Sequence, residues 1–177
     1  MVYNDTTVVA NGGKIHKNPA KITEFMQKGG ILMSFVGTYR HSLDSKNRFF
    51  IPAKFRDMLG DTFYITRKLT TNSLVIYSEE EWDKKAEIID NIADSVGEDI
   101  KELFYSEAID PTPDAQGRVT LTPALVEYAK IDKNIVIAGY GSYIQIWPEE
   151  VWEERQKEKQ AEDRMKHIQE INLRFNL

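Results

Sequence analysis

Two pairs of oppositely charged residues stand out in this chain of 177 residues, because each places an aspartate four positions before an arginine. Asp44 precedes Arg48, and Asp114 precedes Arg118. Two aspartates brought together could share a proton as a catalytic dyad, but an arginine beside each aspartate would keep its carboxyl group ionised. The spacing therefore favours two ion-paired turns over an acid–base catalytic pair.

The other side chains that commonly do chemistry do not suggest a second site. The histidines, His16, His41 and His167, are scattered along the chain, and cysteine is absent, which excludes disulfides and thiolate ligands. A calcium-binding loop would need glutamate where the two motifs place Phe55 and Leu125, and no phosphate-binding glycine pattern is present. We therefore expect no enzyme activity, no metal site, no cofactor and no small-molecule substrate.

Both motifs belong to an internal duplication with a constant offset of 70 residues. Adding this offset carries Tyr77 onto Trp147 and Trp82 onto Trp152, besides superposing the two Asp-x-x-x-Arg motifs. A repeat of this length predicts two copies of one supersecondary unit packed about a pseudo-two-fold axis. We expect Trp82 and Trp152 to pack their helices onto a central barrel and to contact no ligand.

Each motif has the residue types of a tight turn. The carboxylates of Asp44 and Asp114 can accept hydrogen bonds from backbone amides two residues further on. Asn47 and Gly117 occupy the same position in the two copies, and these two residue types adopt a positive φ most readily. The sequence therefore predicts a positive-φ turn in each copy.

Strands and short helices must position these turns. Aromatic and β-branched residues predict strands over 37–43, 48–51, 62–66, 73–77, 134–138 and 143–147. Pro52 and Pro123 favour helix starts, with Thr122 as a cap, and Ser78 with Glu81 forms a capping box.

The resulting order in each copy is β-hairpin, short helix, β-hairpin and helix. We therefore expect an α+β fold in which hairpins of the two copies interleave into a small closed barrel with flanking helices. The predicted divisions are an N-terminal extension over 1–32, a first repeat over 33–105, a second repeat over 106–152 and a C-terminal helix over 153–177.

The N-terminal extension is polar, and we expect it to be unstructured or to precede a natural start at Met33. No apolar run is long enough to span a membrane or to serve as a secretory signal, so we expect no membrane partner.

The two copies differ in net charge, although the net charge of the whole chain is −5. Seven basic and three acidic residues give +4 over Gly37–Lys68, whereas three basic and five acidic residues give −2 over the equivalent Glu107–Ala138. A shared fold does not require this difference, so we expect the first copy to carry a nucleic-acid-binding face. A hairpin tip with Lys46 and Arg48 would lead into the major groove. The candidate contact residues are Arg40, His41, Lys46, Arg48, Lys54 and Arg56.

Two alternatives to these roles remain open. Arg48 and Arg118 could act only as salt-bridge partners that stabilise their turns, although turn stabilisation and DNA contact can coexist. A basic cluster on a surface could also be merely solvated.

From Met33 to about Trp152 the sequence closely resembles the MraZ family of bacterial transcriptional regulators. The residues that carry the resemblance are Gly37, His41-Ser-Leu-Asp-Ser-Lys-Asn-Arg48, Ile51-Pro-Ala-Lys-Phe-Arg56, Tyr77 through Trp82, and Asp114-Ala-Gln-Gly-Arg118. The sequence departs from the family pattern at Asn47, where the family has glycine, and in the unmatched N-terminal extension.

The resemblance implies an AbrB-like swapped-hairpin barrel and assembly of chains into rings. It also implies binding, in the cytoplasm and at the nucleoid, to short direct repeats in double-stranded DNA upstream of the protein's own operon, the cluster for cell division and cell-wall synthesis. The alternative is a non-catalytic oligomeric scaffold or antitoxin-like module whose basic tip binds an acidic protein partner.

Overall fold

The computed structural model describes residues 8–9, 15–16, 34–92, 95–159 and 162–175. Within the N-terminal extension it describes only β1 (Val8–Val9) and β2 (Ile15–His16), which pair antiparallel. The predictions for the rest of that extension, including a natural start at Met33, lie outside the described residues.

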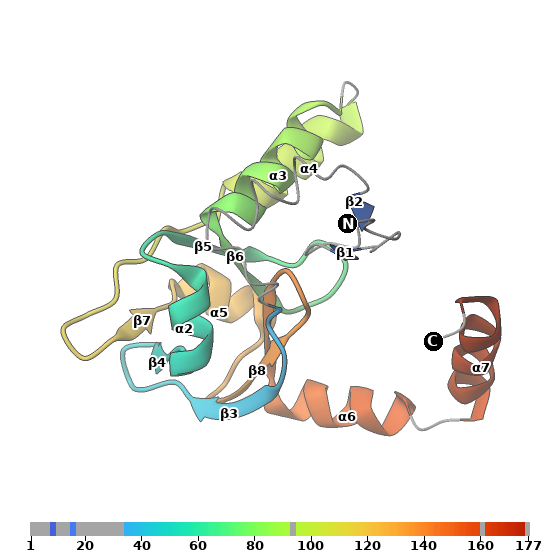
Figure 1. Ribbon diagram of the computed structural model, residues 1–177. Helices are drawn as coiled ribbons and strands as arrows, with labels where there is room; N and C mark the ends of the chain where they lie inside the picture. The colour runs from blue at the N-terminus through green and yellow to red at the C-terminus, as the bar shows by residue number, and fades with distance from the viewer. Residues whose placement is uncertain (1–7, 10–14, 17–33, 93–94, 160–161, 176–177) are drawn as a thin grey trace, which may run out of the picture.

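The fold is α+β, as predicted, and its main sheet has five antiparallel strands in the order β3-β8-β9-β6-β5 (Figure 1). A separate two-stranded sheet joins β4 to β7. Each predicted strand boundary lies within one residue of the observed one. The strands are β3 (Thr38–Ser42), β4 (Arg48–Phe50), β5 (Phe63–Arg67), β6 (Leu74–Ser78), β7 (Arg118–Thr120), β8 (Asn134–Gly139) and β9 (Ile144–Pro148).

Strand register supports the expected pseudo-two-fold relation between the copies. Phe49 lies opposite Val119 at the centre of the β4–β7 pair, and Val75 lies opposite Gln145 at the centre of the β6–β9 pair. In both pairs the central residues are repeat equivalents, so an approximate two-fold axis passes between them.

The prediction that the strands over 37–43 and 48–51 pair with each other as a hairpin is wrong, because each pairs with a strand of the other copy. Strand β3 pairs with β8, and β4 pairs with β7. The equivalent first strand of the second copy is reduced to one bridge between Ile65 and Ile109, where Pro111 and Pro113 remove backbone donors. The copies thus interleave, but among the described residues the strands fall into separate sheets and are not joined as one closed barrel.

The described part of the chain has six helices, of which α7 lies away from the sheets (Figure 1). The predicted caps are confirmed at the hydroxyls: Ser78 and Thr122 accept from the backbone amides of Glu81 and Leu125. The Glu81 carboxylate of the predicted capping box pairs with Lys84. The C-terminal region is helical on both sides of residues 160–161, which lie outside the described residues, and α4 was not predicted. The helices are α2 (Ala53–Leu59), α3 (Glu79–Asp90), α4 (Ser95–Tyr105), α5 (Pro123–Ala129), α6 (Glu149–Lys159) and α7 (Glu162–Phe175).

Two clusters of buried side chains connect these elements. The main core includes the fully buried Phe55 of α2 and its repeat equivalent Leu125 of α5. The second cluster centres on Trp82 of α3, which stacks between Tyr64 and Phe104 at ring separations of 4.5 and 4.4 Å. The predicted packing role of Trp82 is therefore confirmed.

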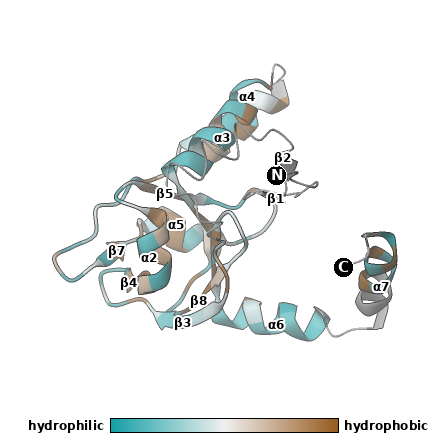
Figure 2. Cartoon of the chain, viewed as in Figure 1, coloured by the Kyte–Doolittle hydropathy of each residue, from teal (hydrophilic) through white to brown (hydrophobic). Residues whose placement is uncertain are grey.

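The surface elements differ in polarity and position. Helices α3 and α4 project together from one end, and α6 leads away from the sheet towards α7 (Figure 1). Figure 2 shows α6 to be hydrophilic along most of its length. Strands β4 and β7, with the loops that precede them, form a further end of the molecule.

Candidate nucleic-acid interface

Both Asp-x-x-x-Arg motifs form the turns that their residue types predict. Asp44 Oδ1 accepts hydrogen bonds from the backbone amides of Lys46 at 2.8 Å and Arg48 at 3.0 Å. Asp114 Oδ1 accepts the equivalent bonds from Gln116 and Arg118, both at 2.9 Å. The carboxylates thus replace backbone acceptors within each turn.

The positive backbone dihedrals predicted for both turns are confirmed. Asn47 has φ 57° and Gly117 has φ 78°. The turns can reverse direction without strain at these positions, since asparagine and glycine tolerate the left-handed region.

Each arginine is held by its own aspartate in a two-point contact. Arg48 Nε and Nη2 lie 2.8 and 2.7 Å from Asp44 Oδ2. Arg118 Nε and Nη2 lie at the same two distances from Asp114 Oδ2. Both arginines therefore form the salt bridges that their spacing predicts. Because these contacts use the Nε side of the guanidinium, the Nη1–Nη2 edge still has N–H groups that can donate elsewhere.

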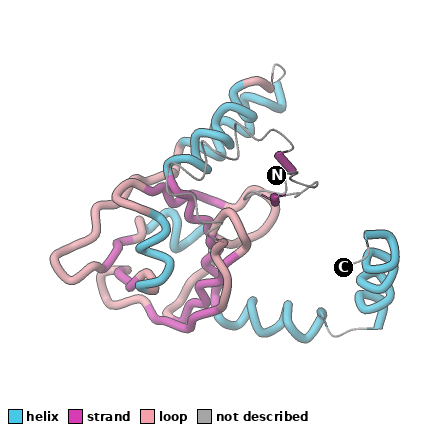
Figure 3. Tube along the Cα trace, viewed as in Figure 1, coloured by secondary structure: helices cyan, strands magenta, loops and turns pink. Residues whose placement is uncertain are grey.

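Ion pairs also connect the two turns. Arg48 Nη1 lies 3.8 Å from Asp114 Oδ2, and Arg118 Nη1 lies 3.7 Å from Asp44 Oδ2. Figure 3 shows the two loops side by side at the end formed by β4 and β7. We call residues 44–48 and 114–118 the paired turns, because pairing and electrostatics make them one unit.

The arginines lower the pKa values of both aspartates. For Asp44 the largest cause is the side-chain hydrogen bond from Arg48, which holds the pKa of the carboxyl group well below its usual range. For Asp114 the backbone hydrogen bond from Arg118 lowers the pKa most, followed by the side-chain hydrogen bond from the same residue.

We expect the paired turns to lose their contribution to stability in acid. A depressed folded-state pKa stabilises the fold above the unfolded-state pKa, near 3.8, and this stabilisation is lost as the pH falls through the folded-state values. The free energy of unfolding should decrease between about pH 5 and pH 2, and it should do so less steeply after Asp44→Asn together with Asp114→Asn.

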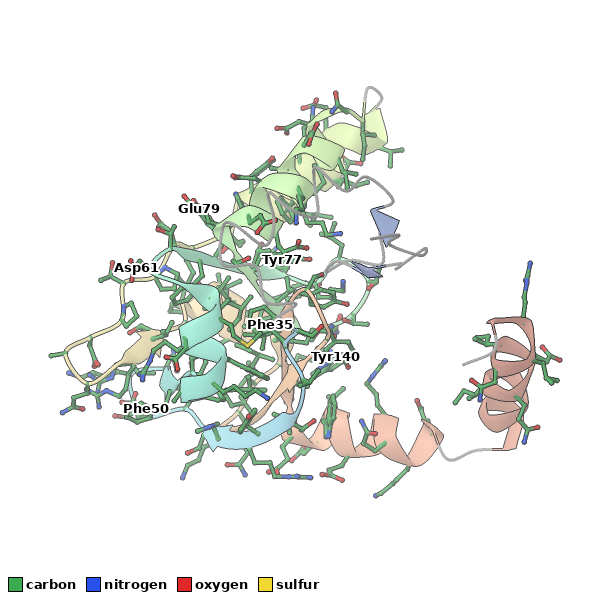
Figure 4. All side chains as sticks on the ribbon, in the orientation of Figure 1. Phe35, Phe50, Asp61, Tyr77, Glu79 and Tyr140 are labelled. Carbon is green, nitrogen blue, oxygen red and sulfur yellow. The ribbon has the colours of Figure 1, made fainter. Side chains whose placement is uncertain are left out.

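Thermal unfolding followed by circular dichroism across this pH range measures the effect. Asp61→Asn is the matched control, because Asp61 (labelled in Figure 4) is exposed and has isoleucine instead of arginine four residues on. If the double variant and the wild type have parallel pH profiles, the paired turns do not contribute in this way.

Two of the candidate basic residues are exposed at the paired turns. Lys46 lies at the exposed tip of the first turn. Arg56 projects from α2 towards the second turn, where its Nη1 atom would lie 2.7 Å from a β-carbon added at Gly117. The exposed ring of Phe50, which is labelled in Figure 4, lies on β4 at the same end of the molecule.

Lys54 is exposed on the opposite flank of α2. Lys54 and Arg56 precede and follow the buried Phe55, and each is therefore about 100° from it around the helix axis. Since Arg56 reaches the second turn, Lys54 faces away from it.

The structure does not bring Arg40 and His41 to the paired turns as free cations. Arg40 Nε lies 3.0 Å from Glu149 Oε1 of α6, and its Nη2 also contacts Glu153. Residues alternate in direction along β3, so His41 faces the other side, where it is half-buried. Burial lowers the pKa of the His41 imidazole and so favours its neutral form.

Two further cations of the first copy are engaged elsewhere. Arg67 pairs with Glu107 at 3.3 Å, and the Lys68 ammonium lies 4.6 Å from the centre of the Tyr143 ring. The +4 charge of the first copy is therefore only partly concentrated at the paired turns, which sequence counting could not reveal.

No cluster of three or more histidine, cysteine, aspartate or glutamate side chains in the described part of the chain is placed to hold a metal ion. Nor does any helix there have the length and apolar character needed to cross a membrane.

These features define an internally duplicated α+β protein in which two Asp-x-x-x-Arg turns of different copies are paired. A family model described as "MraZ protein, putative antitoxin-like" matches residues 34–96 and 104–175. The chain belongs to the MraZ family, and the resemblance seen in the sequence is confirmed.

Several curated relatives extend over most of the chain. A protein named Transcriptional regulator MraZ from Dictyoglomus thermophilum is 40% identical over 136 residues, which is 76% of this chain and 92% of the relative. Proteins of the same name from Dictyoglomus turgidum and Natranaerobius thermophilus are 39% and 38% identical, and they cover 77% and 81% of this chain and 94% and 99% of their own lengths.

Proposed function

We propose that this protein is a sequence-specific DNA-binding transcriptional regulator and not an enzyme. The observation that supports this most strongly is the pairing of two turns at one end of the fold, with the exposed cations Lys46 and Arg56 beside them. Lysine and arginine neutralise phosphates, which supplies the part of binding that does not depend on sequence. The names of the relatives support the same role.

The salt bridges can orient the turn arginines for base recognition. A bidentate arginine contact to guanine requires two adjacent N–H groups that point at the O6 and N7 atoms. Asp44 holds the Nε side of Arg48 and thereby fixes the direction of the Nη1–Nη2 edge. In this proposal Lys46 contacts phosphate, Arg48 contacts a guanine edge, and Lys54 meets the backbone beside the groove. Arg40 and His41 would join only after leaving their present surroundings.

The biological setting is also proposed from the family resemblance. The DNA would be short direct repeats upstream of the protein's own operon for cell division and cell-wall synthesis, so the protein would act in the cytoplasm at the nucleoid. The interleaved strands would correspond to an AbrB-like swapped-hairpin barrel. Several chains would form a ring, which places basic tips against successive repeats and raises their effective concentration.

A mobility shift on the DNA upstream of the protein's own gene, at several salt concentrations, tests this function. If Lys46 contacts a phosphate, Lys46→Ala should weaken binding to specific and scrambled DNA alike and reduce the slope of log K against log salt by about one unit. Gln116→Ala changes the equivalent exposed position of the second turn and should leave the slope unchanged. Wild-type binding that does not depend on salt or on the repeats would contradict the proposal.

Light scattering tests the assembly. We expect a closed cyclic oligomer at micromolar concentration, formed through surfaces outside the paired turns. A clean monomer would show that the ring is wrong, independently of DNA binding.

The alternative function is a non-catalytic scaffold or antitoxin-like module that binds an acidic protein through the same cations. The words "antitoxin-like" in the family description support this alternative. The mobility shift separates the two functions, because this alternative does not require a preference for the upstream repeats.

A further inference from the structure

The paired turns differ at one position for which the structure offers a reason. Asn47 and Gly117 are repeat equivalents, and both have a positive φ, so the backbone alone permits asparagine at either. A β-carbon at Gly117, however, would lie 2.7 Å from Nη1 of Arg56, which is closer than van der Waals contact. The second turn lacks a side chain where the guanidinium of Arg56 passes.

The first turn has no such neighbour. The repeat equivalent of Arg56 is Val126 of α5, which is half-buried and packs against the main core. A valine brings no cation to Asn47, so a side chain can be present there.

Arg56 also restores the charge that the second turn lacks. The first turn presents Lys46 at its tip, whereas the second presents the uncharged Gln116. Arg56 is exposed, and within the described residues no ion pair links it to a carboxylate. With Arg56 included, the paired turns carry four cations (Lys46, Arg48, Arg56 and Arg118) against the two carboxylates of Asp44 and Asp114.

We propose that Gly117 is a positioning residue that keeps Arg56 across the second turn, so that the nucleic-acid-binding face spans both turns instead of the first copy alone. This inference rests on the proposed DNA-binding function and extends it. Asparagine tolerates a positive φ, as Asn47 shows in the first turn, so an asparagine at position 117 would push away the flexible end of Arg56 with little disturbance of the backbone. The expected change is therefore a loss of polyanion binding with little loss of stability.

A double-mutant cycle on the full-length assembled protein tests the coupling. Arg56→Ala and Gly117→Asn should each weaken DNA binding about 5- to 10-fold and reduce the salt slope by about one unit, as expected for one lost phosphate contact. In the Arg56→Ala protein, Gly117→Asn should cause no further loss, since the cation it displaces is already absent. Gly117→Ala introduces only the β-carbon and should weaken binding in the same direction.

Gly141→Asn controls for backbone strain. Gly141 has φ 75°, close to the 78° of Gly117, but the nearest atom to an added β-carbon is Ser34 Oγ at 4.0 Å. This control should leave the salt slope unchanged. Equal losses from Gly117→Asn with and without Arg56 would overturn the proposal, because Gly117 would then act independently of the cation.

Elution from heparin at increasing salt separates this proposal from the proposed function. Heparin is a polyanion that reports the exposed cations whether or not DNA is the natural partner. If the wild type fails to bind the upstream DNA, the proposed function is wrong, and the cycle measured by heparin elution still decides the role of Gly117. Coupled shifts in elution support the inference, and additive shifts overturn it.

Discussion

Phe55→Ala is expected to lower the free energy of unfolding by about 3–5 kcal/mol, the usual cost of truncating a fully buried phenylalanine. Phe55 is 0% exposed, and its ring packs in T-shaped pairs with Phe35 and Tyr39 at centroid separations of 5.5 and 5.1 Å. It anchors α2, which carries Arg56, against β3 and the core. The loss combines the lost burial of the ring with the cavity left behind.

Phe50→Ala is the matched control for this prediction. Phe50, in β4, is also a phenylalanine but is 45% exposed. Its truncation should therefore lower the free energy of unfolding by less than about 1 kcal/mol. Urea unfolding of both variants at constant protein concentration measures the difference. Equal shifts in the unfolding midpoint would show that α2 is not held by this contact.

Arg48→Ala is expected to weaken binding to specific DNA by about 1–3 kcal/mol and to relax the sequence preference, because a bidentate contact to guanine would be lost. The matched variant is Arg118→Ala, since both arginines make the same two contacts with their aspartates, at 2.8 and 2.7 Å. Each substitution removes one salt bridge from the paired turns, and the effects on stability should therefore be similar.

The effects on DNA should differ if the base contact belongs to Arg48. Arg118→Ala should act chiefly through stability and leave the sequence preference unchanged, because the proposal assigns the base contact to Arg48 and none to Arg118. Competition mobility shifts with specific and scrambled DNA measure the affinity and the sequence preference. The comparison uses only variants whose assembly, measured by light scattering, matches that of the wild type. If Arg118→Ala abolished specific binding in an intact assembly while Arg48→Ala left it unchanged, the assignment to the first turn would be wrong.

Local features were predictable because their causes lie within a few residues of the chain. The Asp44 and Asp114 turns, the positive φ at Asn47 and Gly117, and the helix cap at Ser78 all depend on side chains that bond to nearby backbone amides. The constant repeat offset likewise identified which segments are equivalent. These local features alone indicate the α+β class and the resemblance to the MraZ family.

Strand partners were less predictable, because an edge can pair with any segment that the chain brings alongside it. The residue types along the chain located β3 and β4 but did not show that each strand pairs with the other copy. Helix α4 was not predicted, although Val96, Ile100 and Phe104 have helical spacing. Gly97 in its first turn disfavours a helix.

The sequence by itself determined the two turns, their duplication and the charge difference between the copies. Only the tertiary structure decided which cations meet, because side chains far apart in the chain come together through strand pairing and helix packing. It placed Arg48 and Arg118 against each other's aspartates, directed Arg40 to α6, and brought Arg56 to Gly117. Electrostatic interactions depend on distance in space, and a residue count therefore gives the charge of a copy but not the place where that charge is exposed.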